Sequence, residues 1–502
     1  MLNNAVRSNS SASSRARINR LIIFFAAAAI ILAGIIRYIA QPSFWLDEAF
    51  IASSLLEPSR QSIFGPLEYG QFFPRIYLAS IAALRETFGY HIWDLRLLPT
   101  LSFIVATVMW ARLLAQRSRE YLTVALLAAA SFIGSMLWLD QAIQLKQYTF
   151  DVMLALVPFV VGDEFFKQSL VEGKRKWLLI LLALPCALSY TYPIALGARA
   201  AGWYINQARR AGGRVNSKAV FIFAATLALA LLSLWWTDHR FNLQDSEAYF
   251  AYWKDCILRS AFNEGWGATL RLIAKFLWGW HGRQPFVTAS IAPLQIAGVY
   301  SVIKRCKKRD VGTGDLRWGS RSLGSIVLIA GVMLASAVAN YPICAGRVVL
   351  FAQIHLQILA IEGALFILSF SKSRNLVLIS LWLASAVVLF HSAREYVNFI
   401  RSEPAENLRP ILSLIDPNVT NTAWVHPCSI AQVKTLPGGL PVEQVAFGSE
   451  KRFPQRGQKT WIIWTHLGNE ECVRQLDEVR SRARSWQVIH EGTGRGLALA
   501  EF

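Results

Sequence analysis

The stretch Phe44-Trp45-Leu46-Asp47-Glu48-Ala49-Phe50 follows almost directly on the first long apolar run of the chain, at about residues 21–40. It places two adjacent carboxylates, Asp47 and Glu48, among aromatic rings at the edge of a candidate membrane span. Ionisable groups at a bilayer edge are costly unless they are solvated or paired, so they indicate a functional site. The structural alternative is that both acids occupy the first turn of a short helix, where negative charge suits the helix dipole.

The composition is that of a protein with many membrane spans. Of the 502 residues, 54% are hydrophobic and only 17% are charged, against about 25% charged residues in soluble domains. A net charge of +19 would suit nucleic-acid binding, but Lys and Arg gathered in short loops between spans explain it equally well. We therefore expect a mainly α-helical, polytopic membrane protein that lies in a lipid bilayer and binds no nucleic acid.

The basic loops decide which apolar segments cross the membrane. Segment 73–88 is either a span or a helix that lies flat in the membrane interface. Only the second interpretation, the flat reading, puts every later basic loop on the cytoplasmic side. Tyr38-Ile39-Ala40 is a poor cleavage site, so the first run is interpreted as an uncleaved signal anchor. About eleven spans of roughly 20 residues are then expected: 21–40, 95–115, 121–139, 143–162, 177–193, 194–208, 219–237, 286–303, 323–341, 346–369 and 375–391.

Three regions follow from this pattern. Residues 1–20 are expected to be a disordered, basic cytoplasmic tail. Residues 21–400 form the membrane domain, with outer loops at 41–93 and 238–285. Residues 404–502 form a small α/β domain outside the membrane, with predicted strands at 423–426, 460–465, 486–491 and 496–501 and predicted helices at 430–436 and 470–483.

Four stretches follow one another on the expected outer side of the membrane. They are Trp45–Ala49; Phe73–Tyr77 through Leu95–Pro99; Gln144–Thr149; and Asn340-Tyr341-Pro342 with Gly346-Arg347. In this order they resemble motifs of the integral-membrane C-type (GT-C) glycosyltransferases, a family that includes the aminoarabinose transferases of lipid A and the protein O-mannosyltransferases. Trp45–Ala49 is like a DEA-type motif and Gln144–Thr149 like an Arg/Lys-x-Tyr start of a span, whereas Phe73-Pro74 stands where the family has Pro-Pro. The resemblance covers roughly residues 20–370.

The resemblance implies transfer of a sugar from a polyprenyl-phosphate donor to a hydroxyl or amine of a glycan, lipid or protein acceptor. The reaction would take place on the extracytoplasmic face of a bacterial inner (plasma) membrane. Asp47 is then the candidate general base, and Glu48 would orient Asp47 or the acceptor. The charge on the leaving phosphate requires fixed cations, for which the candidates are Arg347, Lys146 and Arg75.

Each of these assignments has a structural alternative. Lys146 and Arg347 are also placed where basic side chains extend to lipid headgroups. Supporting or acceptor-binding roles are open for Asp140, Tyr148, Tyr341 and Glu68, while the two tyrosines also suit an interfacial aromatic belt. The lone His239 and His281 do not predict a metal site, so no cofactor is assigned, and a divalent metal remains open.

Two other functions compete with a glycosyltransferase. The first is a transporter or flippase of lipid-linked sugars, although the repeated halves and interrupted helices typical of transporters are not evident. The second, a ligase or polymerase of surface polysaccharide, differs mainly in its donor. Outside the cytoplasm, disulfides are permitted. Cys428 and Cys472 either pair or remain buried thiols, and Cys256 and Cys344 are alternative partners.

Overall fold

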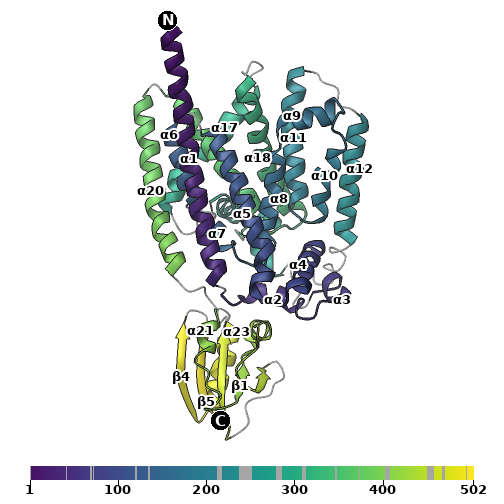
Figure 1. Ribbon diagram of the computed structural model, residues 1–502, viewed down its shortest axis with the longest axis vertical. Helices are drawn as coiled ribbons and strands as arrows, with labels where there is room; N and C mark the ends of the chain where they lie inside the picture. Colours follow the sequence, from purple (N-terminus) through teal and green to yellow (C-terminus); the bar gives the residue numbers. More distant parts are fainter. Residues whose placement is uncertain are drawn as a thin grey trace.

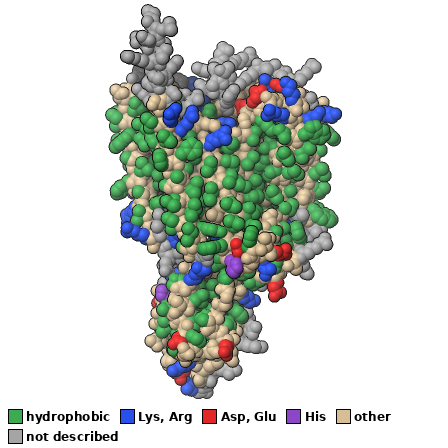
Figure 2. All heavy atoms as spheres, viewed as in Figure 1, with side chains coloured by type: hydrophobic (Ala, Val, Ile, Leu, Met, Phe, Trp, Pro, Cys, Tyr) green, Lys and Arg blue, Asp and Glu red, His purple; other side chains and the backbone are tan. Residues whose placement is uncertain are grey.

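The structure is a computed structural model that describes residues 2–40, 42–67, 71, 73–118, 121–133, 136–211, 217–236, 251–278, 285–307, 313–344, 347–371, 373–401, 407–448, 457–465, 470–492 and 495–502. Figure 1 shows a bundle of helices with a small domain at one end, while the N-terminus lies at the other end. Hydrophobic side chains cover the flank of the bundle in a broad band, and most charged side chains gather at its two ends (Figure 2).

Seven helices in the described part of the chain are long and apolar enough to cross a membrane. They are α1 (Leu2–Ala40), α5 (Ile92–Arg117), α12 (Ser217–Leu234), α17 (Pro285–Lys307), α18 (Thr313–Val338), α19 (Leu350–Phe370) and α20 (Arg374–Arg401). The remaining expected spans correspond to α6 (Leu122–Ile133), α8 (Tyr148–Val160), α10 (Leu178–Ala183) with η3 (Leu184–Ala187), and α11 (Tyr192–Ala211). The expectation of a polytopic helical membrane protein is confirmed.

The boundaries of several expected elements differ from the sequence analysis. Residues 2–20, expected to be a disordered tail, continue α1, because extending an existing helix costs far less than starting one. The expected span at 143–162 begins only at Tyr148, and residues 141–147 form a turn. Pro185 changes the end of the expected span at 177–193 into a 3₁₀ turn, since its ring cannot supply a helical N–H.

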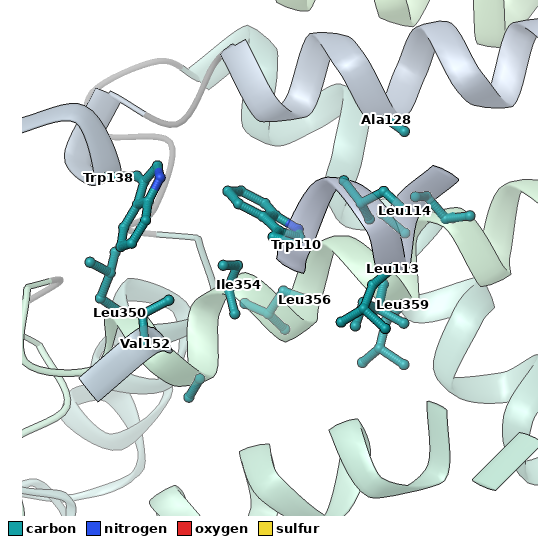
Figure 3. Close-up of a cluster of buried hydrophobic side chains, with 14 of the residues drawn as sticks. Trp110, Leu113, Leu114, Ala128, Trp138, Val152, Leu350, Ile354, Leu356 and Leu359 are labelled. Carbon is teal, nitrogen blue, oxygen red and sulfur yellow. The ribbon is translucent and has the colours of Figure 1, made fainter. Parts of the chain in front are cut away.

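Close helix contacts hold the bundle together. Gly298 of α17 and Gly363 of α19 face one another, and a Cβ at either position would overlap a backbone carbonyl of the opposite helix. Such small residues allow membrane helices to approach closely. Trp110, Leu113 and Leu114 of α5 pack with Ile354, Leu356 and Leu359 of α19 (Figure 3).

A buried ion cluster ties helices together at the end of α5 distant from Asp47. Glu362 of α19 accepts hydrogen bonds from Arg117 of α5, at 2.8 and 2.9 Å, and from Arg305 of α17. The Ser322 hydroxyl of α18 donates to the same carboxylate at 3.0 Å. The buried charge is therefore compensated, as its stability requires.

Short helices occupy the end of the bundle that bears the small domain. Figure 1 shows α2 (Leu46–Ser53), α3 (Arg60–Phe64) and α4 (Arg75–Phe88) there. With 14 residues, α4 is about 21 Å long and cannot span a hydrocarbon core of about 30 Å. This agrees with the flat reading of segment 73–88. The other short elements are α7 (Met136–Asp140), α9 (Asp163–Phe166), η2 (Lys167–Val171), η6 (Lys254–Cys256), α15 (Leu258–Glu264) and α16 (Trp266–Trp278).

The C-terminal domain contains a five-stranded sheet in the order β2-β1-β3-β5-β4. β1 is parallel to β2 and β3, whereas β5 is antiparallel to β3 and β4. All four predicted strands are present, as β1 (Thr422–Val425), β3 (Lys459–Thr465), β4 (Ser485–Gly492) and β5 (Arg495–Glu501). The sequence analysis missed the edge strand β2 (Gln444–Phe447), a strand of only four residues, all of them exposed or partly exposed. The helical elements are α21 (Arg409–Leu412), η8 (Pro427–Ser429), α22 (Ile430–Lys434) and α23 (Glu470–Arg482).

Two disulfides are present, and both join distant segments. Cys428 pairs with Cys472 at a Cα separation of 6.3 Å, and Cys256 pairs with Cys344 at 4.8 Å. The sequence analysis left these pairings open. Cys186 and Cys306 take part in neither disulfide, and Cys306 lies at the end of α17, among the basic residues expected to be cytoplasmic.

Candidate active site

The acidic pair lies in the first turn of α2. The helix begins after Trp45, and the Glu48 carboxylate turns back to accept a hydrogen bond from the Trp45 amide at 3.3 Å. This contact satisfies one of the N–H groups that a helix start leaves open. Both acids thus lie in the first turn of a helix, as the structural alternative expected, and Glu48 is the one that caps it.

Glu48 is the buried centre of this region, with 1% of its surface exposed. Arg96 of α5 donates two hydrogen bonds to its carboxylate, from Nε to Oε1 at 2.9 Å and from Nη2 to Oε2 at 2.6 Å. The Leu145 amide donates to Oε1 at 2.5 Å, and Arg96 also donates to the Pro42 carbonyl at 2.6 Å. With both of its oxygens engaged, Glu48 joins α2, α5 and the turn at 141–147, and it is arranged to position its neighbours.

Asp47 forms an ion pair with Arg347. Its Oδ2 lies 2.7 Å from Arg347 Nη2, and the two side chains are 23% and 24% exposed. The Arg347 guanidinium also covers the Trp45 ring, with its carbon 4.8 Å from the ring centroid. Asp47 is thus accessible, and it lies beside a cation and an aromatic plane.

The loop that carries Arg347 connects α18 to α19 and is fixed at several points. Tyr341 donates a hydrogen bond from its hydroxyl to the Val348 carbonyl at 2.9 Å. Asn340 has a positive φ of 56°, a conformation that asparagine tolerates better than most residues. The Cys256–Cys344 disulfide joins the loop to the segment before α15. These constraints hold Arg347 over Trp45.

Lys146 completes a group of charges around Asp47. Its Nζ donates to Gln71 Oε1 at 2.7 Å, and the residue is 4% exposed. Burial lowers the pKa of the Lys146 ammonium to about 8, although the nearby Asp47 raises it, and Arg347 lowers it further. Asp47, Arg347 and Lys146 come from three distant parts of the chain and act on one another electrostatically.

Several buried polar atoms near these charges lack a hydrogen-bond partner among the described residues. They are Trp45 Nε1, Gln144 Oε1, Gln147 Oε1 and Asn340 Oδ1. Native structures contain few such atoms, and each calls for an explanation. Their occurrence beside Asp47, Lys146 and Arg347 favours a site shaped for a polar ligand.

The other predicted site residues have varied surroundings. Arg75 begins α4 and is fully buried, Tyr148 begins α8 and is buried, and Asp140 ends α7, where it is exposed. Tyr341 supports the Arg347 loop, as described above. Glu68 and Gly346 lie outside the described residues, as do His239 and His281.

Some residues near the site were not assigned roles from the sequence. Arg96 lies in the stretch Leu95–Pro99, and it could have been singled out as a charged residue close to the start of an apolar span. Asp151, fully buried in α8, accepts a hydrogen bond from Ser189, whose hydroxyl also contacts Thr191 at 3.1 Å. Gln71 could not have been singled out from the sequence, because polar residues are common in loops and do not indicate a site.

Hydrogen bonds join the C-terminal domain to the segment that precedes Asp47. The Ser43 amide donates to Asn407 Oδ1 at 2.9 Å, and the Leu408 amide donates to Ser43 Oγ at 2.8 Å. Gln432 of α22 reaches the Phe44 carbonyl at 3.5 Å. The domain therefore contacts the site directly through its linker and through α22.

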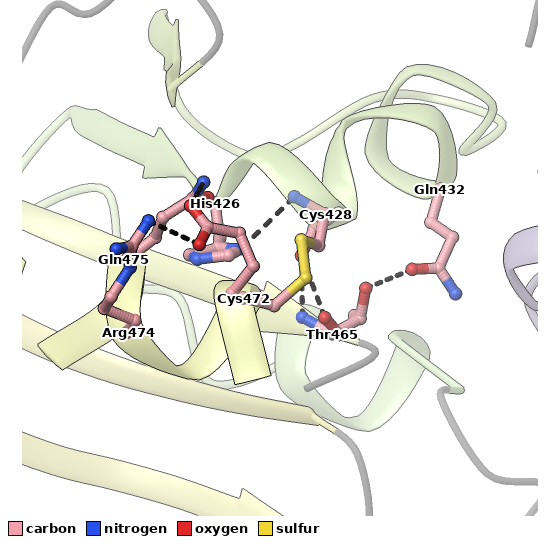
Figure 4. The surroundings of a disulfide bond; sticks show 9 residues. His426, Cys428, Gln432, Thr465, Cys472, Arg474 and Gln475 are labelled. Atoms are coloured by element: carbon pink, nitrogen blue, oxygen red, sulfur yellow. Dashed lines mark hydrogen bonds and ion pairs between the residues drawn. A yellow bond between two sulfur atoms is a disulfide. The ribbon is translucent and has the colours of Figure 1, made fainter. Parts of the chain in front are cut away.

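The Cys428–Cys472 disulfide lies next to this contact (Figure 4). It ties the start of the α22 region to α23. Thr465, at the end of β3, donates from its hydroxyl to Gln432 Oε1, and its amide donates to Ser429 Oγ at 2.7 Å. The disulfide and these hydrogen bonds fix the helix that touches Phe44.

No group of three or more His, Cys, Asp or Glu side chains among the described residues is arranged to hold a metal ion. The described charges that face one another here are the accessible carboxylate of Asp47, the guanidinium of Arg347 and the buried ammonium of Lys146. Such a set can take a proton and bind an anion.

The solved structures to which this chain is similar include two of one protein. They are the crystal structures of ArnT from Cupriavidus metallidurans in the apo state and bound to undecaprenyl phosphate. Each comparison covers 95% of this chain and 97% of the other, at 12% sequence identity, with TM-scores of 0.39 and 0.40 respectively. No protein-family model and no curated protein matches the chain.

Proposed function

We propose that this protein is a membrane glycosyltransferase that moves a sugar from a polyprenyl-phosphate donor to an acceptor hydroxyl or amine. The observation that carries the proposal is the convergence of Asp47, Arg347 and Lys146. These are one candidate base and two candidate phosphate ligands. The motif resemblance of the sequence assigns the same three residues to this reaction.

In this mechanism the acceptor oxygen or nitrogen attacks the anomeric carbon of the sugar. The bond between that carbon and the phosphate oxygen breaks, and its electron pair leaves with the lipid phosphate. Asp47 takes the proton from the acceptor, for which its accessibility suits it. Arg347 and Lys146 stabilise the negative charge that grows on the phosphate, and the forked guanidinium of Arg347 can bind two of its oxygens.

Glu48 keeps in this proposal the orienting role toward Asp47 that the resemblance implied. Its carboxylate is buried and bound by Arg96 and Leu145. It therefore positions Asp47, its neighbour in α2, and Lys146, its neighbour across the turn. Arg75 remains a third candidate cation for the donor.

We place the reaction on the extracytoplasmic face of a bacterial inner membrane, with residues 21–400 as the transferase domain and 404–502 outside the membrane. The basic loops support this orientation. The two disulfides support it as well, because both lie on the side assigned to the oxidising compartment.

Donor turnover tests the proposal. Purified protein is incubated with a panel of polyprenyl-phosphate sugars and a membrane extract as acceptor, and release of free polyprenyl phosphate is measured by mass spectrometry. We expect release with at least one donor, and a loss of roughly 10²–10⁴-fold in Asp47→Asn. Glu57→Gln, which changes an exposed carboxylate beyond the same helix, serves as the matched control.

Two outcomes would count against this function. Release by Asp47→Asn at the parental rate would remove Asp47 from the chemistry. Movement of intact donor across vesicle membranes without release of lipid phosphate would favour a flippase.

A further inference from the structure

A second polar site lies between α15 and α16, outside the group around Asp47. It is a cavity of about 190 Å³ lined by Asp255, Glu264, Arg271 and Lys275 over a floor that includes Leu272. This volume is roughly six times that of a water molecule in the liquid, which suits a small polar head group. The cavity brings charges of both signs to one place.

The four charged side chains are unpaired in the part of the chain that the structure describes. Among the described residues, none of these side chains takes part in a hydrogen bond or an ion pair. Asp255 belongs to η6 and Glu264 ends α15, while Arg271 and Lys275 are one turn apart on α16. Acids and bases that face one cavity without pairing are complementary to a ligand that carries both charges.

α16 has three distinct faces. Thr269, Leu272 and Phe276 are buried against the protein, and Arg271 and Lys275 form the basic face. The third face is apolar yet exposed, with Trp266 76% and Leu270 61% accessible. An exposed apolar stripe beside a basic stripe is the pattern of a helix that lies in a membrane interface.

The contacts of α15 and α16 hold them level with the ends of membrane-spanning helices. The Leu258 amide donates to Ser336 in the last turn of α18 at 2.8 Å. Gln353 in the first turn of α19 donates to the Phe276 carbonyl at 3.0 Å. Since the ends of spanning helices mark the membrane surface, these two contacts hold the start of α15 and the end of α16 near that surface.

We propose that this cavity binds the head group of a membrane phospholipid that carries both a phosphate and a primary ammonium. Arg271 and Lys275 bind the phosphate, Asp255 and Glu264 accept hydrogen bonds from the ammonium, and the acyl chains lie along Trp266 and Leu270. The site is separate from the proposed sugar transfer, and its test requires no enzyme activity.

Lipid retention measures this binding directly. The full-length protein is purified in detergent and titrated with phosphatidylethanolamine or phosphatidylglycerol, and bound lipid is counted by native mass spectrometry. We expect tighter retention of phosphatidylethanolamine. Replacing both bases, Arg271→Gln with Lys275→Gln, should weaken its retention roughly tenfold, because charge-assisted hydrogen bonds are lost.

The acidic variant separates the two charges of the head group. Asp255→Asn with Glu264→Gln should remove the preference for phosphatidylethanolamine over phosphatidylglycerol. Arg259→Gln, which changes an exposed base of α15 outside the cavity, should behave like the parent. Equal retention of both lipids by the parent, or unchanged retention in both double variants with parental melting temperatures, would overturn the proposal.

Discussion

Asp47 and Glu48 are adjacent residues of the same charge type with different environments. Asp47 is accessible and faces Arg347, whereas Glu48 is buried and held by Arg96. In the first turn of a helix, neighbouring side chains point in different directions, so one acid faces the site and the other faces the bundle. The division between chemistry and positioning that we propose for the two acids rests on this geometry.

Lys146 should give donor use a pH dependence. Its pKa is lowered to about 8 by burial, so the ammonium is present below that pH and is lost above it. If the ammonium binds the donor phosphate, kcat/KM for the donor should fall as the pH rises through about 8, because this parameter reports the free enzyme. Lys146→Arg should remove that fall, since arginine stays charged.

The matched control for this profile is Lys254→Arg, at an exposed lysine. It should keep the parental pH dependence. Persistence of the fall near pH 8 in Lys146→Arg would assign the titration to another group.

At the scale of elements, α2 is held between the helical bundle and the C-terminal domain. Arg96 of α5 binds Glu48 and the Pro42 carbonyl from the side of the bundle. The C-terminal domain binds Ser43 and Phe44 from the other side. A short helix of eight residues has little stability of its own, so these contacts determine its place.

Breaking the Glu48–Arg96 pair should destabilise the protein. Glu48→Ala leaves a buried guanidinium without its partner, a change that costs roughly 3–5 kcal/mol, so the melting temperature should fall clearly in a thermal unfolding experiment. Asp47→Asn should change it little, because a half-exposed ion pair contributes about 0–1 kcal/mol. A Glu48→Ala protein with the parental melting temperature and no activity would instead assign Glu48 to the chemistry.

The Cys428–Cys472 disulfide should stabilise the C-terminal domain. It closes a loop with a sequence separation of 44 residues, and its removal in Cys428→Ser with Cys472→Ser should cost roughly 2–4 kcal/mol. Non-reduced peptide mapping should find the two cysteines linked, and limited proteolysis should cut the domain faster in the variant. Alkylation of both as free thiols without reduction would exclude the bond, whereas Cys186→Ser with Cys306→Ser should leave the map unchanged.

At the scale of the whole molecule, the site lies at the end of the bundle that carries the C-terminal domain (Figure 1). The buried cluster of Glu362, Arg117 and Arg305 is formed further along helices that start at the site end. The ion pairs that join the helices are thus separated from the charges assigned to the donor.

Thiol labelling tests the orientation of the whole chain. In a background with Cys186→Ser and Cys306→Ser, Ser62→Cys in α3 should react with a membrane-impermeant reagent added to intact cells. Ser217→Cys, exposed at the start of α12, should react only after the cells are opened. Labelling of Ser217→Cys in intact cells would reverse the assignment of the faces, and with it the proposed side of the reaction.

The sequence by itself determined the class of the protein, the positions of most helices and strands, and the types of charge at the site. Hydropathy and periodicity are local properties, so the spans and the strands β1, β3, β4 and β5 could be predicted from them. Asp47, Arg347 and Lys146 could be singled out because charges beside apolar runs are conspicuous. The edge strand β2 and the turn at 141–147 carry no such local pattern and were missed.

Only the tertiary structure decided which of these residues meet. The decisive contacts all join segments far apart in the chain. They are the Asp47–Arg347 and Glu48–Arg96 ion pairs, the two disulfides and the hydrogen bond between Ser43 and Leu408. Such contacts depend on how whole helices pack, and a side chain's type does not reveal its partner. For this reason the residue types of Asp47 and Glu48, both suited to catalysis, could not reveal that only Asp47 is accessible.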